Sequence, residues 1–352
     1  MKEEDLPKQP VTVVALLAAV SLLGAAMVTV AAKAIVAAEP ADATAHPGQR
    51  VRLRDGRRLN FRCQGRGQPT VLLEGGFAAT SLAWYKVQPQ IAQTHRACSY
   101  DRAGYGFSDP GPLPRDGAAT AEDLDDGLRA AGIRGPFVLV GHSAGGLYMR
   151  LFADRRPHEV VGMVLADPSI EHQDRRFAAA FGPGAGSLAG MRAKAAACLA
   201  AAEQHALPSN EQSLAACTPK PEPKQLASVN AARLAEAVRP DTWRTQVSEL
   251  DSLWADTSDE VDRGRKSYGG LPLVVLTADG SYAGAPVSVR PAIDALWRSL
   301  HREIAARSSR GVERLVMGSS HMMIFDRPDA IVEAVSDVIT ASRTGRPIAD
   351  RP

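Results

Sequence analysis

The chain has 352 residues, 45% of them hydrophobic and 23% charged, which is the composition of an ordinary globular protein. Its formal net charge is +2, and no basic cluster with interleaved aromatic residues occurs, so the sequence predicts no nucleic-acid partner. About 300 residues remain beyond the N-terminal tail, which suits one large domain or one domain with an insertion.

Residues 1–50 are interpreted as a segment separate from the fold. Residues 11–32 form an apolar run, VTVVALLAAVSLLGAAMVTVAA, with no charged residue before Lys33. A membrane span needs about 20 apolar residues, whereas the core of a secretory signal has about 7–15. We therefore expect an uncleaved membrane anchor and a linker, with the folded part outside the cytoplasm. A signal peptide that is cleaved before secretion is the alternative.

Beyond this segment, short apolar stretches alternate with helix-prone ones. Alternating residues around Asp55-Gly56 predict a β-hairpin. Further strands are expected at residues 70–74, 95–100, 137–140, 160–166, 271–277 and 314–317, and helices at residues 81–93, 120–131, 145–154, 291–306 and 328–341. Thr120 is the expected N-cap of its helix. Strands that alternate with helices indicate βαβ units and a mostly parallel sheet, hence an α/β protein.

Residues 170–268 interrupt this alternation. They are rich in alanine, have few strand signals and are too numerous for a loop within a compact domain. We interpret them as a helical lid, or cap, inserted between two strands of the sheet. The core of the domain then consists of residues 51–169 and 269–345.

The four cysteines fall into two pairs with different expectations. Cys198 and Cys217 lie 19 residues apart in the inserted segment, and two helices joined near Pro208 would bring them together. In an oxidising compartment we expect them to form a disulfide. Cys63 and Cys98 lie in predicted strands and are interpreted as core residues.

Residues 137–146 read FVLVGHSAGG, a strand that runs into Gly-x-Ser-x-Gly ahead of a helix. This context is typical of a nucleophile elbow, in which the serine occupies a strained strand-to-helix turn. A Cβ atom at Gly141 or Gly145 would clash with chains that pass close to the turn. The helix that follows points its free N–H groups and partial positive charge at the hydroxyl. We predict that Ser143 is a nucleophile.

A serine hydroxyl reacts only when a base takes its proton, and in this architecture the acid and the histidine follow the serine in the chain. His321 lies in the loop after the last predicted strand and is the expected base. The ring of His142, inside the elbow, is expected to point away from Ser143. Two aspartates at strand ends could orient His321. Asp167, after GMVLA, is favoured, and Asp279, after LPLVVLTA, is the alternative.

A developing oxyanion needs two backbone donors. The N–H of Ala144, directly after the nucleophile, is one expected donor. The other is expected in the loop after residues 70–74, at the N–H of Phe77. Gly75 and Gly76 allow that loop to fold in tightly.

At this point several segments together resemble the α/β-hydrolase superfamily, in particular serine esterase-like members from high-GC bacteria. The matching segments are LLEGGFAATSLAW, YDRAGYGFSDPGP, GPFVLVGHSAGGLYMRLFA, VVGMVLADPS, LPLVVLTA and GSSHMMIFDRPDAIVEAV. The resemblance implies an eight-stranded, mostly parallel sheet with helices on both faces and no cofactor. Similar sequences often lack a carboxylate on the strand that matches LPLVVLTA, which supports Asp167. Glu74-Gly75-Gly76 departs from the His-Gly of many relatives, but the donor there is a backbone group.

The resemblance and the residues together predict a serine hydrolase that cleaves small-molecule carboxylic esters through an acyl-enzyme. The same three residues could serve perhydrolysis or the cleavage of amides, thioesters or C–C bonds. A different class of function, a ligand-binding protein with negligible turnover, is a further alternative. No paired histidines or Cys-x-x-Cys spacing occurs, so no metal site is predicted.

Overall fold

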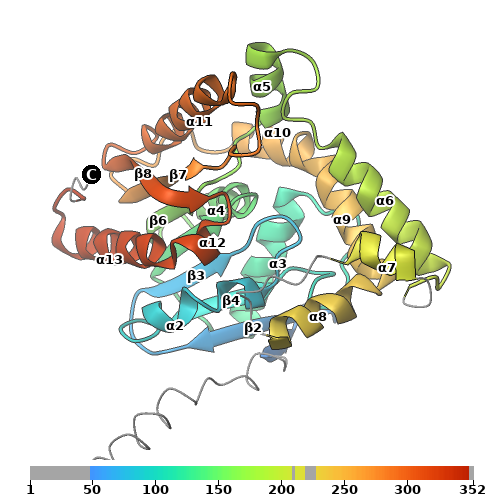
Figure 1. Ribbon diagram of the computed structural model, residues 1–352. Coiled ribbons are helices and arrows are strands. Elements are labelled where there is room, and N and C mark those ends of the chain that lie inside the picture. Colours follow the sequence, from blue (N-terminus) through green and yellow to red (C-terminus); the bar gives the residue numbers. More distant parts are fainter. Residues whose placement is uncertain (1–47, 208–210, 219–226, 349–352) are drawn as a thin grey trace, which may run out of the picture. The chain divides into compact units, whose positions relative to one another are not determined.

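The computed structural model describes residues 48–207, 211–218 and 227–348, and most of their elements are labelled in Figure 1. The segment predicted as a membrane anchor or signal lies outside these residues. The helices of the described part are all too short or too polar to cross a bilayer.

Eight strands form one sheet in the order β1-β2-β4-β3-β5-β6-β7-β8. The strands are β1 (Gln49–Arg52), β2 (Arg58–Gln64), β3 (Thr70–Glu74), β4 (Ala97–Asp101), β5 (Phe137–His142), β6 (Val160–Ala166), β7 (Leu273–Gly280) and β8 (Gly311–Ser320). The predicted hairpin is β1–β2, and β2 is antiparallel to both of its neighbours. All remaining neighbours are parallel, so the predicted mostly parallel sheet is confirmed.

Helices cover both faces of this sheet. One face carries α3 (Gly117–Ala130), α4 (Gly145–Arg155) and α11 (Arg290–Ala305), and the other carries η1 (Ser81–Trp84), α2 (Gln88–Ile91), α12 (Met323–Asp326) and α13 (Pro328–Thr344). Because successive side chains of a strand point to opposite faces, Leu139 of β5 belongs to the first core and Val140 to the second. Strands buried on both faces explain the continuous apolar runs in the sequence.

Two helices differ from their predictions. The helix expected at residues 81–93 is two short elements, the 3₁₀ turn η1 and the four-residue α2. Helix α3 begins before Thr120, because the carboxylate of Asp116 accepts a hydrogen bond from the N–H of Ala119 at 2.8 Å. Asp116 is therefore the N-cap, and Thr120 lies inside the helix.

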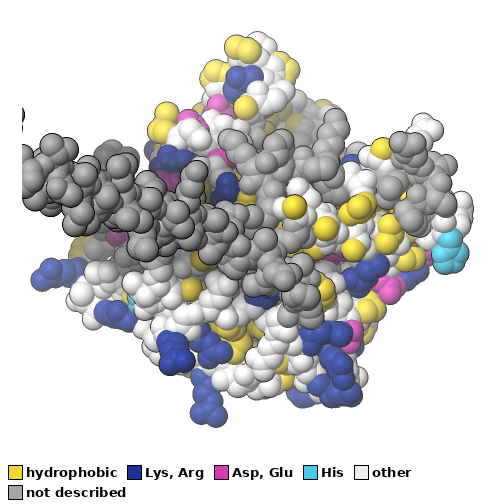
Figure 2. Space-filling view, turned by 60° about the horizontal axis from the view of Figure 1, so that its bottom comes forward, with side chains coloured by type: hydrophobic (Ala, Val, Ile, Leu, Met, Phe, Trp, Pro, Cys, Tyr) yellow, Lys and Arg dark blue, Asp and Glu magenta, His cyan; other side chains and the backbone are white. Residues whose placement is uncertain are grey.

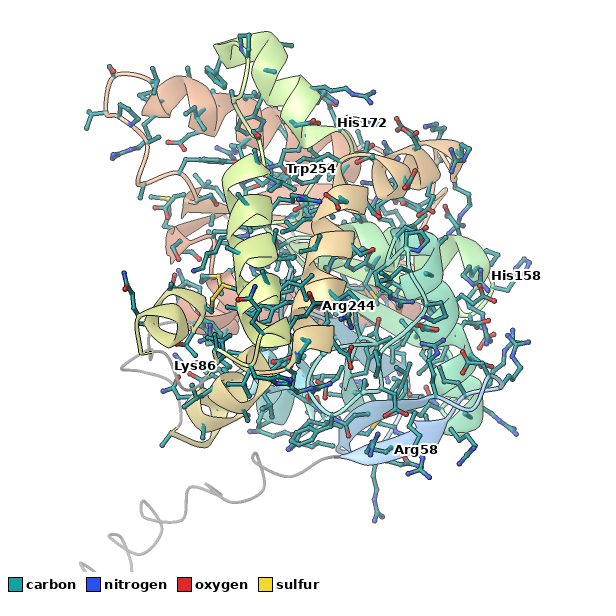
Figure 3. All side chains as sticks on the ribbon, turned by 90° about the vertical axis from the view of Figure 1, so that its right-hand side faces the viewer. Arg58, Lys86, His158, His172, Arg244 and Trp254 are labelled. Carbon is teal, nitrogen blue, oxygen red and sulfur yellow. A yellow bond between two sulfur atoms is a disulfide. The ribbon has the colours of Figure 1, made fainter. Side chains whose placement is uncertain are left out.

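The insertion (residues 170–268) lies between β6 and β7, and its described residues form helices and no strand. The helices are α5 (Gln173–Phe181), α6 (Ala189–Glu203), α7 (Glu211–Cys217), α8 (Ala227–Ala237), α9 (Pro240–Leu253) and α10 (Asp256–Arg263). Helices α6 and α9 lie side by side, with Arg244 on α9 and Trp254 at its C-terminal end (Figure 3). They share a small core that contains Ala195, Trp243 and Leu250.

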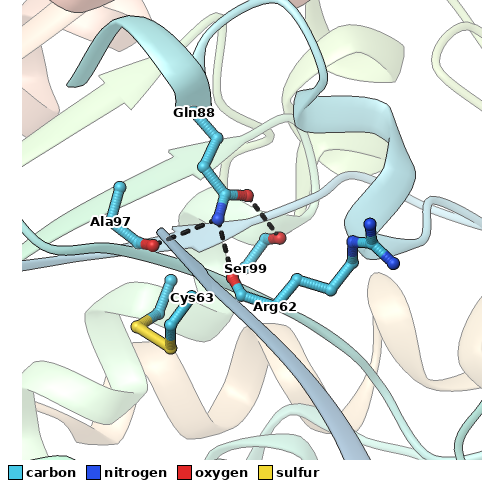
Figure 4. The surroundings of a disulfide bond; sticks show 6 residues. Arg62, Cys63, Gln88, Ala97 and Ser99 are labelled. Carbon is cyan, nitrogen blue, oxygen red and sulfur yellow. Dashed lines mark hydrogen bonds between the residues drawn. A yellow bond between two sulfur atoms is a disulfide. The ribbon is translucent and has the colours of Figure 1, made fainter. Parts of the chain in front are cut away.

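Both cysteine pairs form disulfides. The bond between Cys198 and Cys217 joins α6 to the end of α7. Cys63 and Cys98 are also bonded, a pairing that the sequence analysis did not predict (Figure 4). Cys98 lies in the core, as expected. They face each other across the antiparallel pair β2–β4, with their Cα atoms 4.1 Å apart. The pairing follows from the neighbouring positions of β2 and β4, which the sequence did not predict. Cys63 is exposed rather than buried.

Charged side chains are distributed over the surface. On the face shown in Figure 2, lysine and arginine side chains occur as separate groups among acidic and uncharged ones. Many of the arginines are paired with carboxylates, as in the pairs Arg192–Asp251 and Arg265–Asp154. Exposed pairs of this kind contribute about 0–1 kcal/mol each, so the fold depends mainly on its two apolar cores.

Candidate active site

The loop between β5 and α4 has the geometry of an elbow. Ser143 has a φ of +54°, a left-handed conformation that is strained for a residue with a side chain. A Cβ atom on Gly141 would lie 2.6 Å from the carbonyl oxygen of Gly145, and one on Gly145 would lie 2.5 Å from the carbonyl oxygen of Glu74. Both glycines are therefore required by close backbone contacts, as the sequence predicted.

A chain of hydrogen bonds leads away from the elbow serine. His321 Nε2 lies 3.0 Å from Ser143 Oγ, and His321 Nδ1 lies 2.7 Å from Asp167 Oδ2. The serine comes from the end of β5, the aspartate follows β6 and the histidine follows β8. The carboxyl ends of parallel strands meet at one edge of the sheet, and this brings together residues that are 178 and 154 positions apart.

Asp167 is fully buried and hydrogen-bonded on both carboxylate oxygens. Oδ1 accepts from the N–H of Ala278 at 3.0 Å and from the indole N–H of Trp297 at 2.9 Å, and Oδ2 accepts from the hydroxyl of Ser281 as well as from His321. Burial alone would raise the pKa of Asp167, but the hydrogen bond and charge of His321 outweigh it and hold the pKa below its usual value. The carboxylate is therefore ionised at neutral pH.

Asp279, the other aspartate that the sequence allowed, has different partners. Its two oxygens accept hydrogen bonds from the N–H groups of Gly318 and Ser319, both at 3.0 Å. It thereby ties the end of β7 to the bulge in β8 that precedes His321. The geometry places Asp167, and not Asp279, on the imidazole.

His142 is in direct contact with His321, a relation that the sequence did not reveal. Its ring is buried, lies 5.0 Å from the ring of His321 and forms a 2.7 Å hydrogen bond from Nε2 to the His321 carbonyl oxygen. Because a carbonyl only accepts, Nε2 must carry the proton. Burial, assisted by the nearby His321, lowers the pKa of His142 to about 4, so the ring is neutral at pH 7.

The two expected oxyanion donors lie beside the serine. Phe77 and Ala144 both line the cavity above Ser143. Within the described part of the chain, neither backbone N–H donates a hydrogen bond. A Cβ atom on Gly76 would lie 2.9 Å from Ser143 Cβ, so only glycine allows the loop to approach this closely.

A cavity of about 690 Å³ opens above these residues. That volume is in the range of small-molecule sites. Its walls are mostly apolar and come from both the core and the insertion; they include Phe77, Leu188, Met191, Val229, Trp243, Leu250, Leu253, Trp254, Tyr282, Ile324 and Phe325. Polar side chains on the insertion side include Lys194, Arg233, Glu236 and Gln246. Among the described residues, no group of three or more potential ligands is placed to hold a metal ion.

Comparisons with known proteins agree with this architecture. The sequence model of the alpha/beta hydrolase fold family matches residues 69–246. An AB hydrolase superfamily protein from Gibberella zeae is 35% identical over 113 residues, which cover 30% of this chain and 35% of that protein. The chain spans between 16% and 42% of the length of the curated relatives that it matches.

Solved structures extend the likeness to most of the chain. A putative lipase from Acinetobacter baumannii has a TM-score of 0.60 and 17% identity, with 88% of this chain and 96% of that chain covered. The epoxide hydrolase CorEH has a TM-score of 0.59 and 15% identity, with 83% and 98% covered. At these identities the likeness concerns the fold.

Proposed function

The chain belongs to the alpha/beta hydrolase fold family, and from this premise we propose that it is a serine hydrolase that cleaves carboxylic esters through an acyl-enzyme. One observation carries the proposal. Ser143, His321 and Asp167 are joined by hydrogen bonds of 3.0 and 2.7 Å at the base of an apolar cavity. Nucleophile, base and orienting acid within hydrogen-bond reach are the arrangement that activates a serine.

In the first half-reaction, Ser143 Oγ attacks the carbonyl carbon of the ester while His321 Nε2 accepts the hydroxyl proton. A C–O bond forms, and the carbonyl π electrons move onto the oxygen. The N–H groups of Phe77 and Ala144 are the proposed donors to this oxyanion. Collapse of the intermediate breaks the bond to the alcohol, which leaves with the proton from His321 and leaves an acyl group on Ser143.

In the second half-reaction, water attacks the acyl carbon and His321 takes one of its protons. The new tetrahedral intermediate collapses, Ser143 receives the proton back from His321, and the carboxylic acid is released. Asp167 keeps its negative charge throughout. Its role is to hold the imidazole with Nδ1 protonated and to stabilise the imidazolium that forms twice in each cycle.

The residue at the elbow distinguishes the proposed ester hydrolysis from epoxide hydrolysis. Epoxide hydrolysis on this fold requires a carboxylate nucleophile, and the position holds Ser143. Perhydrolysis and the cleavage of amides, thioesters or C–C bonds use the same three residues, and they are outcomes that a substrate panel would reveal. Ligand binding without turnover is the remaining alternative, and covalent labelling of the serine would contradict it.

The apolar wall of the cavity favours ester substrates that carry a bulky apolar group. Aromatic and aliphatic side chains form most of its wall, and the insertion supplies many of them. We propose that the insertion acts as a lid that selects the substrate, because it covers the cavity while contributing none of the three reacting residues. The proposed reaction requires no cofactor.

We also propose that the folded part lies outside the cytoplasm, held by an N-terminal membrane anchor or secreted after cleavage of a signal. Two disulfides support this proposal, because such bonds persist in oxidising compartments and are rare in the cytosol. Separation of cell membranes from soluble fractions, followed by immunodetection, would distinguish an anchored protein from a secreted one. Recovery in the cytosol with reduced cysteines would contradict both forms of the proposal.

Hydrolysis of 4-nitrophenyl esters of graded acyl length tests the proposed activity. We expect wild-type turnover and a loss of kcat of about 10⁴-fold or more in Ser143→Ala, because the nucleophile is removed. Ser309→Ala, which removes an exposed serine before β8, is the matched control and should retain full activity. Equal activity of the wild type and Ser143→Ala would contradict the proposal.

A further inference from the structure

A buried ionic cluster lies directly behind the loop that is proposed to hold the oxyanion. Its centre is Arg102, which is 4% exposed and pairs with two carboxylates, Glu74 at 2.7 Å and Glu249 at 3.0 Å. The glutamates are 1% and 3% exposed. An ion pair this deep costs desolvation energy, so its presence is weak evidence for a contribution to stability.

Arg102 also binds the backbone of the oxyanion loop. Its Nη1 donates to the carbonyl oxygen of Gly75 at 3.1 Å, and its Nη2 donates to that of Gly76 at 2.9 Å. The carbonyl of Gly76 and the N–H of Phe77 belong to one planar, trans peptide group and point in opposite directions. A hydrogen bond that fixes this carbonyl therefore fixes the direction of the Phe77 N–H, the proposed oxyanion donor.

The second carboxylate comes from the insertion. Glu249 lies on α9, and its Oε1 accepts both from Arg102 and from the hydroxyl of Tyr148 at 2.8 Å. Tyr105 donates to the other oxygen, and the rings of Tyr105 and Tyr148 lie about the guanidinium at 5.0 and 5.2 Å. The same helix supplies Leu250 to the wall of the cavity. A substrate that contacts α9 is therefore linked to the Gly76–Phe77 peptide through the Glu249–Arg102 ion pair and the hydrogen bond from Arg102 to the Gly76 carbonyl oxygen.

We propose that Arg102 is a positioning residue that orients the Phe77 N–H toward the oxyanion. Glu249 makes this orientation depend on the position of helix α9. The proposal rests on the proposed function, because it assigns a purpose to the oxyanion loop. It also gives a role to Glu74. Glu74 is the counter-charge that keeps Arg102 in place.

The charges of the cluster decide which substitutions are informative. Burial raises the pKa of Glu74, and the neighbouring Glu249 adds to that rise while Arg102 opposes it. Two carboxylates share one guanidinium, so loss of Arg102 leaves two unpaired acids in the interior. Loss of Glu249 leaves Arg102 and Glu74 as a balanced pair. A Glu249 variant should therefore fold even where an Arg102 variant does not.

The test compares four variants with the wild type: Arg102→Gln, Arg102→Lys, Glu249→Leu and Glu249→Gln. Asp337→Asn is the matched control, because it removes a carboxylate that pairs with Arg314 at 2.8 Å, and neither residue lines the cavity. Thermal unfolding establishes which variants fold. Hydrolysis of a 4-nitrophenyl ester gives kcat and KM, and inhibition by an alkyl trifluoromethyl ketone reports on the oxyanion, since the ketone forms a hemiketal with the serine.

We expect kcat to fall about 10–100-fold in Arg102→Gln, somewhat less than for loss of an oxyanion donor itself. Affinity for the ketone should fall by a similar factor, with KM changed less than threefold. Arg102→Lys should be impaired too, because one ammonium cannot span two carbonyls and two carboxylates. Glu249→Leu should lose about threefold to tenfold in both kcat and ketone affinity, whereas Glu249→Gln, which keeps an acceptor oxygen, should restore most of the loss.

A folded Glu249→Leu protein with wild-type kcat and ketone affinity would overturn the inference. A loss that appears equally in Asp337→Asn would also overturn it. A wild-type protein that neither hydrolyses the ester nor binds the ketone would contradict the proposed function itself, and the positioning role with it. Active wild type with unaffected variants would contradict the positioning role alone.

Discussion

The edge of the sheet formed by the carboxyl ends of the strands, called the sheet edge below, and the insertion are built in different ways. At the sheet edge, each proposed reacting group follows the carboxyl end of a strand, and Ser143 and Asp167 both have positive φ values, +54° and +44°. The described residues of the insertion form helices with a small core of their own, and a disulfide joins two of these helices, α6 and α7. The contacts of its described residues with the site include cavity-lining side chains and the buried ion pair of Arg102 and Glu249.

This difference suggests a division of labour. Strained turns on a rigid sheet hold reacting atoms within hydrogen-bond distance, and they tolerate little change. Helices that pack through alanine and leucine can vary in sequence while still closing a cavity. Substitutions at the sheet edge should therefore change the rate of chemistry, whereas substitutions of cavity-lining residues in the insertion, unlike those of Glu249, should change which substrate is accepted. The predictions below test that separation.

The largest effect is expected from the aspartate at the end of β6. Asp167→Asn should lower kcat by about 10⁴-fold, because an amide no longer stabilises the imidazolium or selects its tautomer. Asp279→Asn, at the end of the neighbouring strand, should stay within tenfold of the wild type, since its carboxylate binds backbone N–H groups and not His321. Steady-state hydrolysis of a nitrophenyl ester measures both. A loss confined to Asp279→Asn would reverse the assignment.

Removal of either disulfide, in the sheet or in the insertion, should lower stability, but only removal of the one in the insertion should affect function. Cys63→Ala/Cys98→Ala and Cys198→Ala/Cys217→Ala are each expected to lower the free energy of unfolding by about 2–4 kcal/mol. Only the second pair should also raise KM, because Cys217 lines the cavity. Urea unfolding and ester kinetics provide the two readouts. Unchanged KM in the second pair would argue that the insertion does not shape the site.

The buried His142 predicts how stability depends on pH. Its pKa is about 4 in the folded protein, against about 6.5 in an unfolded chain. Between these values the unfolded state binds a proton that the folded state does not, so stability falls as pH drops from about 6.5 to about 4, by at most about 3 kcal/mol. His142→Gln, which can still donate to the His321 carbonyl, should flatten this part of the profile. An unchanged slope in urea unfolding at several pH values would contradict the assignment.

The smallest effect is expected from the cavity wall contributed by α9. Gln246→Trp should reduce kcat/KM for long acyl chains about tenfold while leaving acetyl esters nearly unchanged, because a larger side chain shortens the cavity. Arg244→Trp is the control on the same helix, where the side chain forms ion pairs with Glu203 and Asp241 and does not line the cavity. Equal losses for short and long esters would show that the wall at Gln246 affects chemistry rather than selection.

Much of the sheet edge could be predicted from sequence because its constraints are local. Gly141 and Gly145 mark the turn around the serine, and alternating strands and helices imply the parallel sheet that brings distant strand ends together. Strand pairing was the missing information for Cys63 and Cys98, since two residues 35 apart meet only when β2 joins β4. Boundaries were also inaccurate where a side-chain cap decided them, as Asp116 did for α3.

The partners of the site residues could not be read from the sequence. Trp297 binds Asp167 from α11, and Ser281 binds it from the loop after β7, but neither carries a local signal for that contact. Arg102 and Glu249 are 147 residues apart, and only the packing of α9 on the core joins them. Such contacts depend on how α11, the loop after β7 and the insertion pack on the sheet, which composition and periodicity do not specify.

Trapping of the acyl-enzyme tests the central claim most directly. Wild-type protein mixed with a nitrophenyl ester and quenched in acid within the first turnovers should gain the mass of one acyl group, and peptide mapping should place that group on Ser143. Ser143→Ala should gain none, and His321→Ala should acylate far more slowly. Ester hydrolysis by the wild type with no acyl group on Ser143, or with the group on another residue, would contradict the account.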